Sequence, residues 1–456
     1  MFVSSAPLSI RKSSTILDYA FLLRTTRLSR ANSIMLFLLG LITLAATVAQ
    51  IVSFKRMFAY VQKELAFTPS PEYAPKASVI LPCKGLDPGF EENIVKLLDQ
   101  RYIGIDGKPR FEVIFAVAQE NDPAYSVLQK VCAMQTKVDT KLVVAGINQA
   151  RAQKINNQLR ALQEIANDTE VLVFVDSDVI ARNDFIQYLI AHLQDETVGV
   201  TTGYRFYIPF KGDWPSLLRS LWNRMSAWEL ADPNYAFAWG GAMATRRETF
   251  AAAKVAEHWD RAADDDLSLT TAVKDIGLKV RFVPQCLVAS HGDATIPEIV
   301  EWTNRQLILT KVYYPKLWRR AIRRAVILVV WLLALAGSIA SAALTGSTEL
   351  IAASVAGLIL LPVEVFFLLK AQHLWYRVLS LSAKEEDFNG VNSAQNSSER
   401  ALMEHAFQSS LLRFSLVLPL AHIVLPWMTL YSVLTNRIRW RGIDYELRSP
   451  SEVVII

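Results

Sequence analysis

Cysteine is scarce in this chain. Only Cys83, Cys132 and Cys286 occur among its 456 residues, and they lie far apart in the sequence. Three scattered thiols form neither a disulfide framework nor a zinc cluster with paired ligand spacing, so the disulfide-rich secreted class is excluded. We interpret the three residues as buried thiols of a protein that stays in a reducing compartment.

Glycine-rich phosphate loops are absent too. None of the 18 glycines belongs to a G-x-G-x-x-G or a G-x-x-x-x-G-K-[ST] motif, which excludes two common ways of cradling a nucleotide phosphate with backbone amides. If the protein binds a nucleotide, the charge of the diphosphate has to be neutralised differently. A divalent ion held by carboxylates is the alternative.

Apolar residues are abundant by contrast, at 52% of the chain. They concentrate in four runs, at residues 34–54, 325–344, 350–369 and 411–434. Each run reaches roughly the 20 residues that cross a bilayer core, and the first begins too late and is too long for a cleavable signal peptide. We therefore expect a multi-pass membrane protein.

Basic residues flank the apolar runs, in "KLWRRAIRR" (316–324) and at Lys55 and Arg56. Basic flanks mark the cytoplasmic side of membrane spans and can also hold anionic lipid headgroups. They favour a cytoplasmic location for the central region of the chain. The last run contains Arg413 and Pro426, so it is either a span or a re-entrant segment.

Between the first two runs, short β-branched stretches alternate with helical patterns. The predicted strands are 77–82, 111–117, 141–146, 171–176 and 198–204, and the predicted helices are 91–100, 124–134, 152–165 and 183–193. This alternation, with nearly continuous apolar strands, predicts an α/β domain with a mostly parallel sheet covered on both faces. Ligands of such sheets bind beyond the carboxyl ends of the strands.

The stretch "VLVFVDSDVI" (171–180) sets Asp176 and Asp178 one residue apart at the end of a predicted strand. Two carboxylates so close repel each other unless a cation lies between them. Mg²⁺ and Mn²⁺ favour oxygen ligands and take one or two protein carboxylates together with phosphate oxygens. The pair is therefore a candidate metal site for a nucleotide diphosphate; an Asp-x-Asp turn without function is the alternative.

Seven stretches in order resemble a known family. They are "LPCKGLDPGF" (81–90), "AVAQENDPA" (116–124), "QKINN" (153–157), "VDSDV" (175–179), "WGGAMATRRETF" (239–250), "DDDLSLTTAVKDIGLKVRFVP" (264–284) and "WTNRQL" (302–307). The region resembles a family 2 type glycosyltransferase domain with the GT-A fold. More narrowly, it is similar to the ceramide glucosyltransferase branch and its bacterial relatives, which implies a location in a bacterial inner membrane.

The resemblance implies roles for the residues that match the motifs. Lys84, Asp122 and Lys154 would line the nucleotide-sugar pocket, with Asp122 facing the uridine. Asp176 would take part in donor binding, and Asp176 and Asp178 would hold Mg²⁺ or Mn²⁺ against the diphosphate. A solvated loop lysine is the alternative for Lys84.

Further roles follow from the later motifs. Asp266 would be the general base, with Asp265 as its partner, and Arg305 would neighbour donor and acceptor. Gly240 and Gly241 would let the sugar lie against the backbone. A helix cap is the alternative for Asp266, because "DDDLSLTTAVKDIG" also reads as an acid-capped helix; for Arg305 it is an interfacial basic set with Lys311.

The chain departs from the family pattern at two places. The family's Q/R-x-x-R-W element has Trp302 and Gln306 at its two ends here, so an aromatic residue and an amide have changed places. Animal ceramide glucosyltransferases lack the aspartate at the position of Asp178, which this chain retains. The retained aspartate favours ordinary metal dependence.

These observations together predict an inverting hexosyltransferase that moves a hexose, with glucose the first choice, from a UDP-sugar to a ceramide-like lipid hydroxyl. The expected partners are the UDP-sugar, the lipid acceptor and the bilayer, and no nucleic acid. The alternatives are a processive polysaccharide synthase and a noncatalytic membrane protein that binds nucleotide sugar or lipid.

The expected domain order has seven parts. They are a basic N-terminal segment (1–30), a transmembrane helix (31–56), a GT-A domain (75–320), two transmembrane helices (325–370), a connecting or interfacial segment (371–410), a transmembrane or re-entrant segment (411–435) and a C-terminal tail (436–456).

Overall fold

The structure is a computed structural model that describes residues 12–134, 137–388, 413–440 and 442–456. The chain divides into two compact units. The first contains the described residues up to Ile51 together with Val326–Phe366, and the second contains Val52–Ala325 and Phe367–Ile456. Part of the expected basic N-terminal segment (1–11) and most of the expected connecting segment (389–410) lie outside the described residues.

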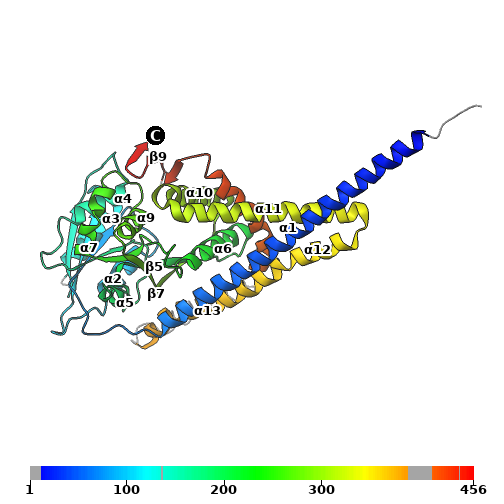
Figure 1. Ribbon diagram of the computed structural model, residues 1–456. Helices are drawn as coiled ribbons and strands as arrows, with labels where there is room; N and C mark the ends of the chain where they lie inside the picture. Colours follow the sequence, from blue (N-terminus) through cyan, green and yellow to red (C-terminus); the bar gives the residue numbers. More distant parts are fainter. Residues whose placement is uncertain (1–11, 135–136, 389–412, 441) are drawn as a thin grey trace, which may run out of the picture. The chain divides into compact units, whose positions relative to one another are not determined.

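The second unit is built around a sheet in which seven described strands follow the order β3-β2-β1-β4-β6-β5-β7 (Figure 1). The strands are β1 (Ala77–Pro82), β2 (Phe111–Val117), β3 (Asp139–Val144), β4 (Val171–Val175), β5 (Val198–Ile208), β6 (Ala242–Arg246) and β7 (Lys279–His291). All residues of β1, β2 and β4 are buried. Burial on both faces explains why these strands are continuously apolar in the sequence.

Most of the sheet is parallel. β3, β2, β1 and β4 run parallel, β5 and β7 pair in parallel, and β6 is antiparallel to β4 and β5. The predicted mostly parallel sheet is therefore confirmed. The sequence does not predict β6 and β7 as strands, because "AMATR" has little β-branched character and a proline interrupts the apolar pattern of β7.

Helices cover both faces of this sheet. One hydrophobic core contains apolar residues of α2 (Phe90–Leu98), α3 (Pro123–Ala133) and α5 (Phe185–Ala191). The other contains residues of α4 (Gln153–Ala161) and α9 (Asp266–Asp275). The two cores lie on opposite sides of the strands because successive strand side chains point to opposite faces.

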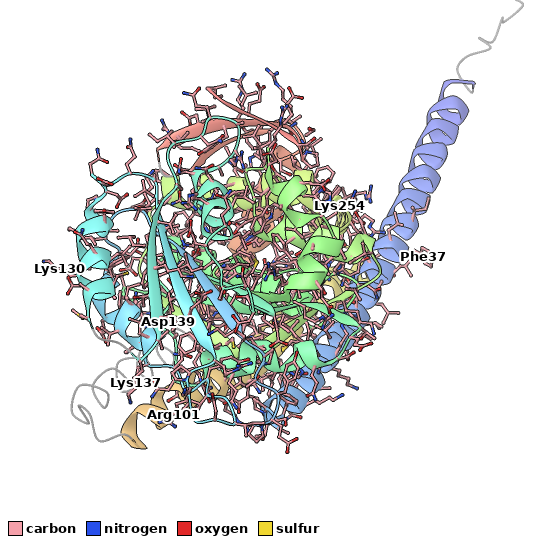
Figure 2. The ribbon with its side chains drawn as sticks, turned by 90° about the vertical axis from the view of Figure 1, so that its left-hand side faces the viewer. Phe37, Arg101, Lys130, Lys137, Asp139 and Lys254 are labelled. Atoms are coloured by element: carbon pink, nitrogen blue, oxygen red, sulfur yellow. The ribbon has the colours of Figure 1, made fainter. Side chains whose placement is uncertain are left out.

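The outer edge of the sheet is protected by charge. β3 is the edge strand, and Lys137 and Asp139 are exposed where it begins, near exposed Lys130 at the end of α3 (Figure 2). Charged side chains at an edge strand discourage pairing with the strand of another chain.

The strand order reverses between β1 and β4. β2 pairs with one side of β1, and the chain returns so that β4 pairs with the other side. The loops that follow these two strands are joined: Ser177 Oγ donates to Asp87 Oδ2 at 2.8 Å, and Asn93 Nδ2 donates to the carbonyl of Ser177 at 3.2 Å. Ligands bind at such a reversal in open α/β sheets.

The remaining helices of the second unit follow the strands. They are α6 (Trp214–Glu229), α7 (Arg247–Ala252), α8 (Val255–Trp259), α10 (Ile296–Tyr313) and the short 3₁₀ turn His192–Gln194. Leu217 and Leu221 of α6 are buried at 2% and 1% exposure, which makes α6 a core helix.

The C-terminal residues form a second sheet, in the order β10-β9-β8 and antiparallel throughout. Its strands are β8 (Arg437–Trp440), β9 (Ile443–Ser449) and β10 (Glu452–Ile455). Leu447 is fully buried in the core that contains Trp259 and Ile308. The segment expected as a tail is therefore part of the packed domain.

Four described helices are long and apolar enough to cross a membrane. They are Leu36–Leu65, Pro315–Thr345, Thr348–Ser380 and Arg413–Tyr431, which agrees with the expected multi-pass protein. The first belongs to the long helix α1 (Lys12–Leu65), the second is α11 (Pro315–Thr345), and the third combines α12 (Thr348–Leu358) with α13 (Leu360–Phe388). α13 continues past residue 370, where the sequence places the end of a span.

The first unit is held by apolar and polar contacts between its helices. Leu39 and Trp331 are buried together, and Trp331 Nε1 donates to Thr43 Oγ1 at 3.2 Å. Gln50 donates a hydrogen bond to Glu364. Polar side chains in membrane helices raise the free energy of the protein unless they are hydrogen-bonded, and this contact pairs two of them.

Candidate active site

Asp176 and Asp178 follow directly after β4, and each carboxylate faces a cation. Asp176 Oδ1 is 2.9 Å from Lys154 Nζ, and Asp178 forms an ion pair with Arg205. The two side chains are 28% and 31% exposed. The repulsion expected between two such close acids is therefore offset by two basic residues from other elements.

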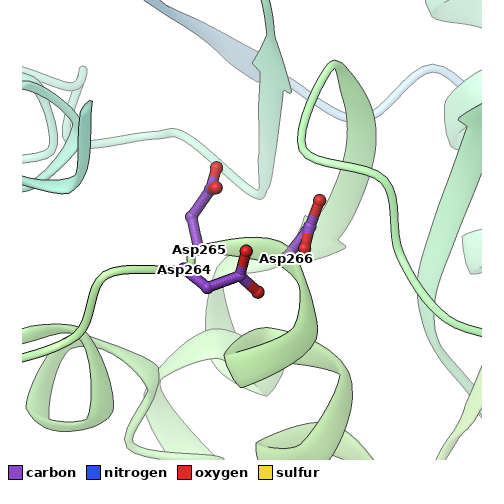
Figure 3. Close-up of side chains that lie close together, drawn as sticks. All are labelled: Asp264, Asp265 and Asp266. Carbon is purple, nitrogen blue, oxygen red and sulfur yellow. The ribbon is translucent and has the colours of Figure 1, made fainter. Parts of the chain in front are cut away.

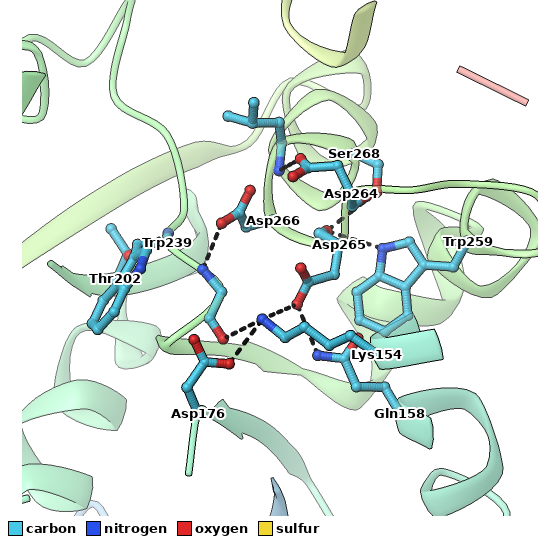
Figure 4. Close-up of polar contacts among 12 residues, drawn as sticks. Lys154, Gln158, Asp176, Thr202, Trp239, Trp259, Asp264, Asp265, Asp266 and Ser268 are labelled. Atoms are coloured by element: carbon cyan, nitrogen blue, oxygen red, sulfur yellow. Dashed lines mark hydrogen bonds and ion pairs between the residues drawn. The ribbon is translucent and has the colours of Figure 1, made fainter. Parts of the chain in front are cut away.

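Lys154 connects the acids of β4 to those of α9 (Figure 4). Its side chain, in the first turn of α4, is 17% exposed, and its Nζ is 2.9 Å from Asp176 Oδ1 and 3.0 Å from Asp265 Oδ2. Nζ also donates to the carbonyl oxygen of Gly240 at 3.2 Å. One ammonium group thus joins three segments that are distant in the sequence.

The three acids at the start of α9 lie close together (Figure 3), and each also contacts other residues. Asp264 Oδ2 accepts from the backbone amide of Leu267 at 3.0 Å and so caps the helix. Asp265 Oδ2 accepts from Lys154 and, at 2.8 Å, from Gln158 Nε2. Asp266 Oδ2 accepts from the amide of Gly240 at 2.7 Å. Asp264 therefore supplies the side-chain cap, and Asp266 is the acid in the first turn of the helix, so the structural alternative for Asp266 stands beside the catalytic one.

The glycine pair before β6 allows this close approach. A Cβ on Gly240 would come within 2.7 Å of Lys154 Nζ and 2.8 Å of Asp265 Oδ2. A Cβ on Gly241 would lie 2.1 Å from the ring of Trp239. Any larger residue at either position would displace a charged group or the indole, so glycine is required by packing.

Arg205 and Trp239 belong to the site and were not singled out from the sequence. Arg205, in β5, donates from both terminal nitrogens to both oxygens of Asp178 at 2.7 Å, and its guanidinium carbon is 5.2 Å from the Trp239 ring centroid. The available signal was a charged residue directly after the predicted strand 198–204.

The charges perturb one another. Burial alone would lower the pKa of Lys154, but the attraction of Asp176, Asp265 and Asp266 reverses this effect and raises it. Burial raises the pKa of Asp176, and the like charges of Asp178 and Asp265 add to the rise. Desolvation, followed by the charge of Asp265, raises the pKa of Asp266 to about 6.

Two expected nucleotide-pocket residues lie in the loops after β1 and β2. Lys84 is exposed. Asp122 Oδ1 accepts from the amides of Gly85 and Ala124, both at 2.9 Å, so it caps α3 and ties the two loops together. The role of Lys84 and Asp122 in nucleotide binding stays a prediction.

Arg305 lies in α10, and the structure records its guanidinium against the C-terminal sheet. Its guanidinium carbon is 5.8 Å from the ring centroid of Trp440 in β8. The grouping of Arg305 with Lys311 at a membrane interface stays the alternative. Lys311 Nζ donates to the carbonyl oxygens of Ser432 at 2.9 Å and Val433 at 3.2 Å, beyond the helix Arg413–Tyr431.

The family model that matches this chain is glycosyl transferase family 21, over residues 35–380. This match covers more than half of the chain. The chain belongs to glycosyl transferase family 21. The family 21 match spans the sheet, the acids of the site and three of the candidate membrane helices. The mostly parallel sheet with its helices on both faces is therefore the core of a glycosyltransferase domain.

One solved structure similar to this family 21 protein is a mannosyltransferase from Pyrobaculum calidifontis in complex with GDP-Man and Mn²⁺. The two chains are 18% identical, the similarity covers 72% of this chain and 99% of the other, and the TM-score is 0.45.

The residues of the site fit a divalent cation. Asp176, Asp178 and the three acids of α9 supply five carboxylates, against the two cationic side chains Lys154 and Arg205. Carboxylate oxygens are the ligands that Mg²⁺ and Mn²⁺ prefer. Burial is the main reason that the pKa values of Asp176 and Asp266 are raised, and the like charges of neighbouring acids add to the rise.

Proposed function

We propose that this family 21 protein transfers a hexose, with glucose the first choice, from a UDP-sugar to a hydroxyl of a ceramide-like membrane lipid, with inversion. The observation that carries the proposal is the position of Lys154 between Asp176 and Asp265, beside Asp266. A donor-binding acid pair and a candidate base therefore face one common site, as a single displacement requires.

Asp266 is the proposed general base. The acceptor hydroxyl attacks the anomeric carbon, the new glycosidic C–O bond forms as the bond from that carbon to UDP breaks, and the hydroxyl proton passes to a carboxylate oxygen of Asp266. A pKa near 6 keeps Asp266 ionised at neutral pH and still basic enough to accept the proton. The amide of Gly240 holds one carboxylate oxygen in place at 2.7 Å.

Other residues bind the donor in this proposal. Asp176 and Asp178 would hold Mg²⁺ or Mn²⁺, which when bound supplies positive charge to the departing diphosphate. Lys154 and Arg205 contribute positive charge beside these acids. Lys84 and Asp122 remain the proposed nucleotide-pocket residues, and Arg305 the proposed neighbour of donor and acceptor.

A membrane-resident acceptor is supported by packing within the second unit. The helix Arg413–Tyr431, a candidate span, buries Met428 beside Ile299 of α10, and Trp222 of α6 packs there too. Its other side exposes Leu416, Ile423 and Trp427. Helices of the catalytic domain thus pack directly on a helix of membrane-spanning length, where a lipid can approach.

The proposed location is a membrane with the catalytic domain in the cytoplasm, such as a bacterial inner membrane. Basic residues lie in the first turns of α11, and two of them form ion pairs with one acid of the catalytic domain: Arg320 Nε is 3.0 Å from Glu229 Oε2, and Arg324 also pairs with Glu229. The positive-inside rule assigns such basic residues next to a span to the cytoplasmic side, which supports the proposed location. Arg320 and Arg324 also form the ion pairs with Glu229.

The test is transfer of radiolabel. Membranes containing the overexpressed full-length protein are incubated with labelled UDP-glucose and Mg²⁺ or Mn²⁺, and the label is followed into chloroform-soluble lipid. The proposal expects a small lipid product. An insoluble polymer would instead indicate a polysaccharide synthase, and absence of transfer with every tested UDP-hexose would favour a binding protein.

The matched variant is Asp266→Asn. It keeps the shape of the side chain but cannot accept the proton, so lipid labelling is expected to fall by roughly 10²-fold or more, while UDP binding survives. Asp275→Asn, at the exposed far end of the same helix, is the control that retains transfer. Undiminished turnover in Asp266→Asn would remove this residue from the base role.

A further inference from the structure

The guanidinium of Arg205 covers the acid pair after β4. Its two terminal nitrogens contact the two oxygens of Asp178 at 2.7 Å, and Nη2 is 3.9 Å from Asp176 Oδ2. A planar guanidinium and a carboxylate that meet through two parallel hydrogen bonds form one of the stronger ion pairs in proteins. Asp178 is therefore held in one orientation by this arginine.

The guanidinium has a second contact that does not involve the acids. Its central carbon is 5.2 Å from the Trp239 ring centroid, within the range of a cation–π interaction. Two hydrogen bonds hold the backbone of Trp239 in place. Its amide donates to Thr202 Oγ1 at 2.8 Å, and its carbonyl oxygen accepts from the amide of Ala242 at 3.0 Å. An arginine that leaves Asp178 can therefore remain beside Trp239.

A divalent ion and Arg205 are incompatible at the same carboxylate. A cation that coordinates an oxygen of Asp178 lies close to that oxygen, and Arg205 already brings positive charge to both oxygens at hydrogen-bond distance. Two cations in such proximity repel each other strongly in a partly buried site, where the side chain of Arg205 is only 18% exposed. The two cations therefore compete for this carboxylate.

We propose that Arg205 is a displaceable counter-ion of Asp178: it holds this carboxylate while no divalent cation is bound, and it turns to the diphosphate of the nucleotide when the cation takes its place. This inference rests on the proposed metal site at Asp176 and Asp178. Arg205 is thus a positioning residue, because it acts through Asp178 before the donor arrives.

The proposal predicts opposite effects on two affinities. Without nucleotide, Arg205 competes with the cation, so Arg205→Gln is expected to bind Mn²⁺ roughly tenfold more tightly than the wild type. At saturating Mn²⁺, the same variant lacks the charge that would reach the diphosphate, so UDP is expected to bind roughly tenfold more weakly. A purely structural role would weaken both.

The measurement uses the full-length protein in detergent. Free Mn²⁺ is titrated and followed by electron paramagnetic resonance, and UDP binding is followed by calorimetry at saturating Mn²⁺. Arg205→Lys is the second variant, which retains the charge but not the two-pronged contact, and a smaller gain in Mn²⁺ affinity is expected for it. Arg281→Gln is the matched control, because it removes another partly buried arginine of the same sheet that pairs with Glu64 instead.

Two results separate the possible failures. If Asp178→Ala loses Mn²⁺ affinity but Arg205→Gln binds Mn²⁺ no better than wild type, the exchange is overturned while the metal site stands. If Asp178→Ala binds Mn²⁺ as the wild type does, the metal site is overturned and the exchange with it. Thermal unfolding of each variant shows that the compared proteins are folded. If Arg205→Gln does not fold, the Mn²⁺ affinity of Arg205→Lys decides whether the exchange takes place.

Discussion

At the scale of single residues, Lys154 has the largest role in assembling the site. Its ammonium group lies within 3.0 Å of acids from β4 and α9. Burial opposes its charge, and the neighbouring carboxylates outweigh that effect. The lysine is therefore ionised, and the positions of the acids depend on it.

Replacement of Lys154 by methionine tests this dependence. The change leaves Asp176 and buried Asp265 without their shared cation, so we expect the free energy of unfolding to fall by roughly 3–5 kcal/mol. Thermal unfolding in detergent measures the loss. Lys130→Met, at an exposed position of α3, is the control with little effect.

A second change checks whether unpaired carboxylate charge causes the stability loss of Lys154→Met. Asp265→Asn in the Lys154→Met background removes one of the stranded charges and is expected to recover part of the lost stability. A double variant that is no more stable than Lys154→Met alone would show that stranded charge is not the reason for the loss.

The pH dependence of transfer follows from Asp266. Its pKa is raised to about 6, and a general base works only in its ionised form. We expect kcat/KM to increase with pH up to about 6 and to level off above it, falling about tenfold per pH unit on the acid side. A profile measured at constant ionic strength checks this, and a plateau extending down to pH 4 would contradict it.

At the scale of elements, the C-terminal sheet is part of the catalytic unit. Leu447 of β9 is fully buried, and Ile438 and Tyr445 share its core with residues of α8 and α10. The same sheet carries Trp440, which the guanidinium of Arg305 faces. The ends of α10 and the last strands of the chain are therefore stabilised together.

Truncation of Leu447 to alanine measures this contribution. A buried leucine that becomes alanine leaves a cavity, so we expect a loss of about 2–5 kcal/mol in the free energy of unfolding. Thermal unfolding of the full-length protein is the measurement, and Arg439→Ala on the exposed face of β8 is the control. Equal stability of the two variants would mean that the sheet does not belong to the folded core.

At the scale of the whole molecule, most of the candidate spans contain residues of both units of the chain. The helix Leu36–Leu65 begins in the first unit and continues into the second, and the helix Thr348–Ser380 does the same. The second unit also contains the site and one complete candidate span, Arg413–Tyr431. One complete candidate span is therefore part of the same unit as the site.

The proposed topology is tested by cysteine labelling in intact cells. If the catalytic domain is cytoplasmic, α11 carries the chain across the membrane, and Thr345→Cys at its exposed end reacts with an impermeant maleimide. Asp275→Cys in the catalytic domain is expected to react only after lysis. The wild type is a suitable blank, because Cys83 and Cys286 are buried and Cys132 is half-buried. Labelling of Asp275→Cys in unbroken cells would reverse the assignment.

Much of the fold is predictable because it is encoded locally. The positions of β1, β2 and β4 follow from continuous apolar runs, which a strand buried on both faces requires. The four spans follow from length and hydropathy in the same way. Asp176 and Asp178 were recognisable because they end such a run.

By itself, then, the sequence determined the strands β1, β2 and β4, the candidate spans and the acids at the strand ends, since each of these depends on neighbouring residues. Only the tertiary structure decided that β6 enters the sheet antiparallel, that Arg205 binds Asp178 from 27 residues away, and that Lys154 joins Asp176 to Asp265. The reason is physical: such pairings depend on strand order and on side-chain packing between distant segments, which local propensity and periodicity do not specify.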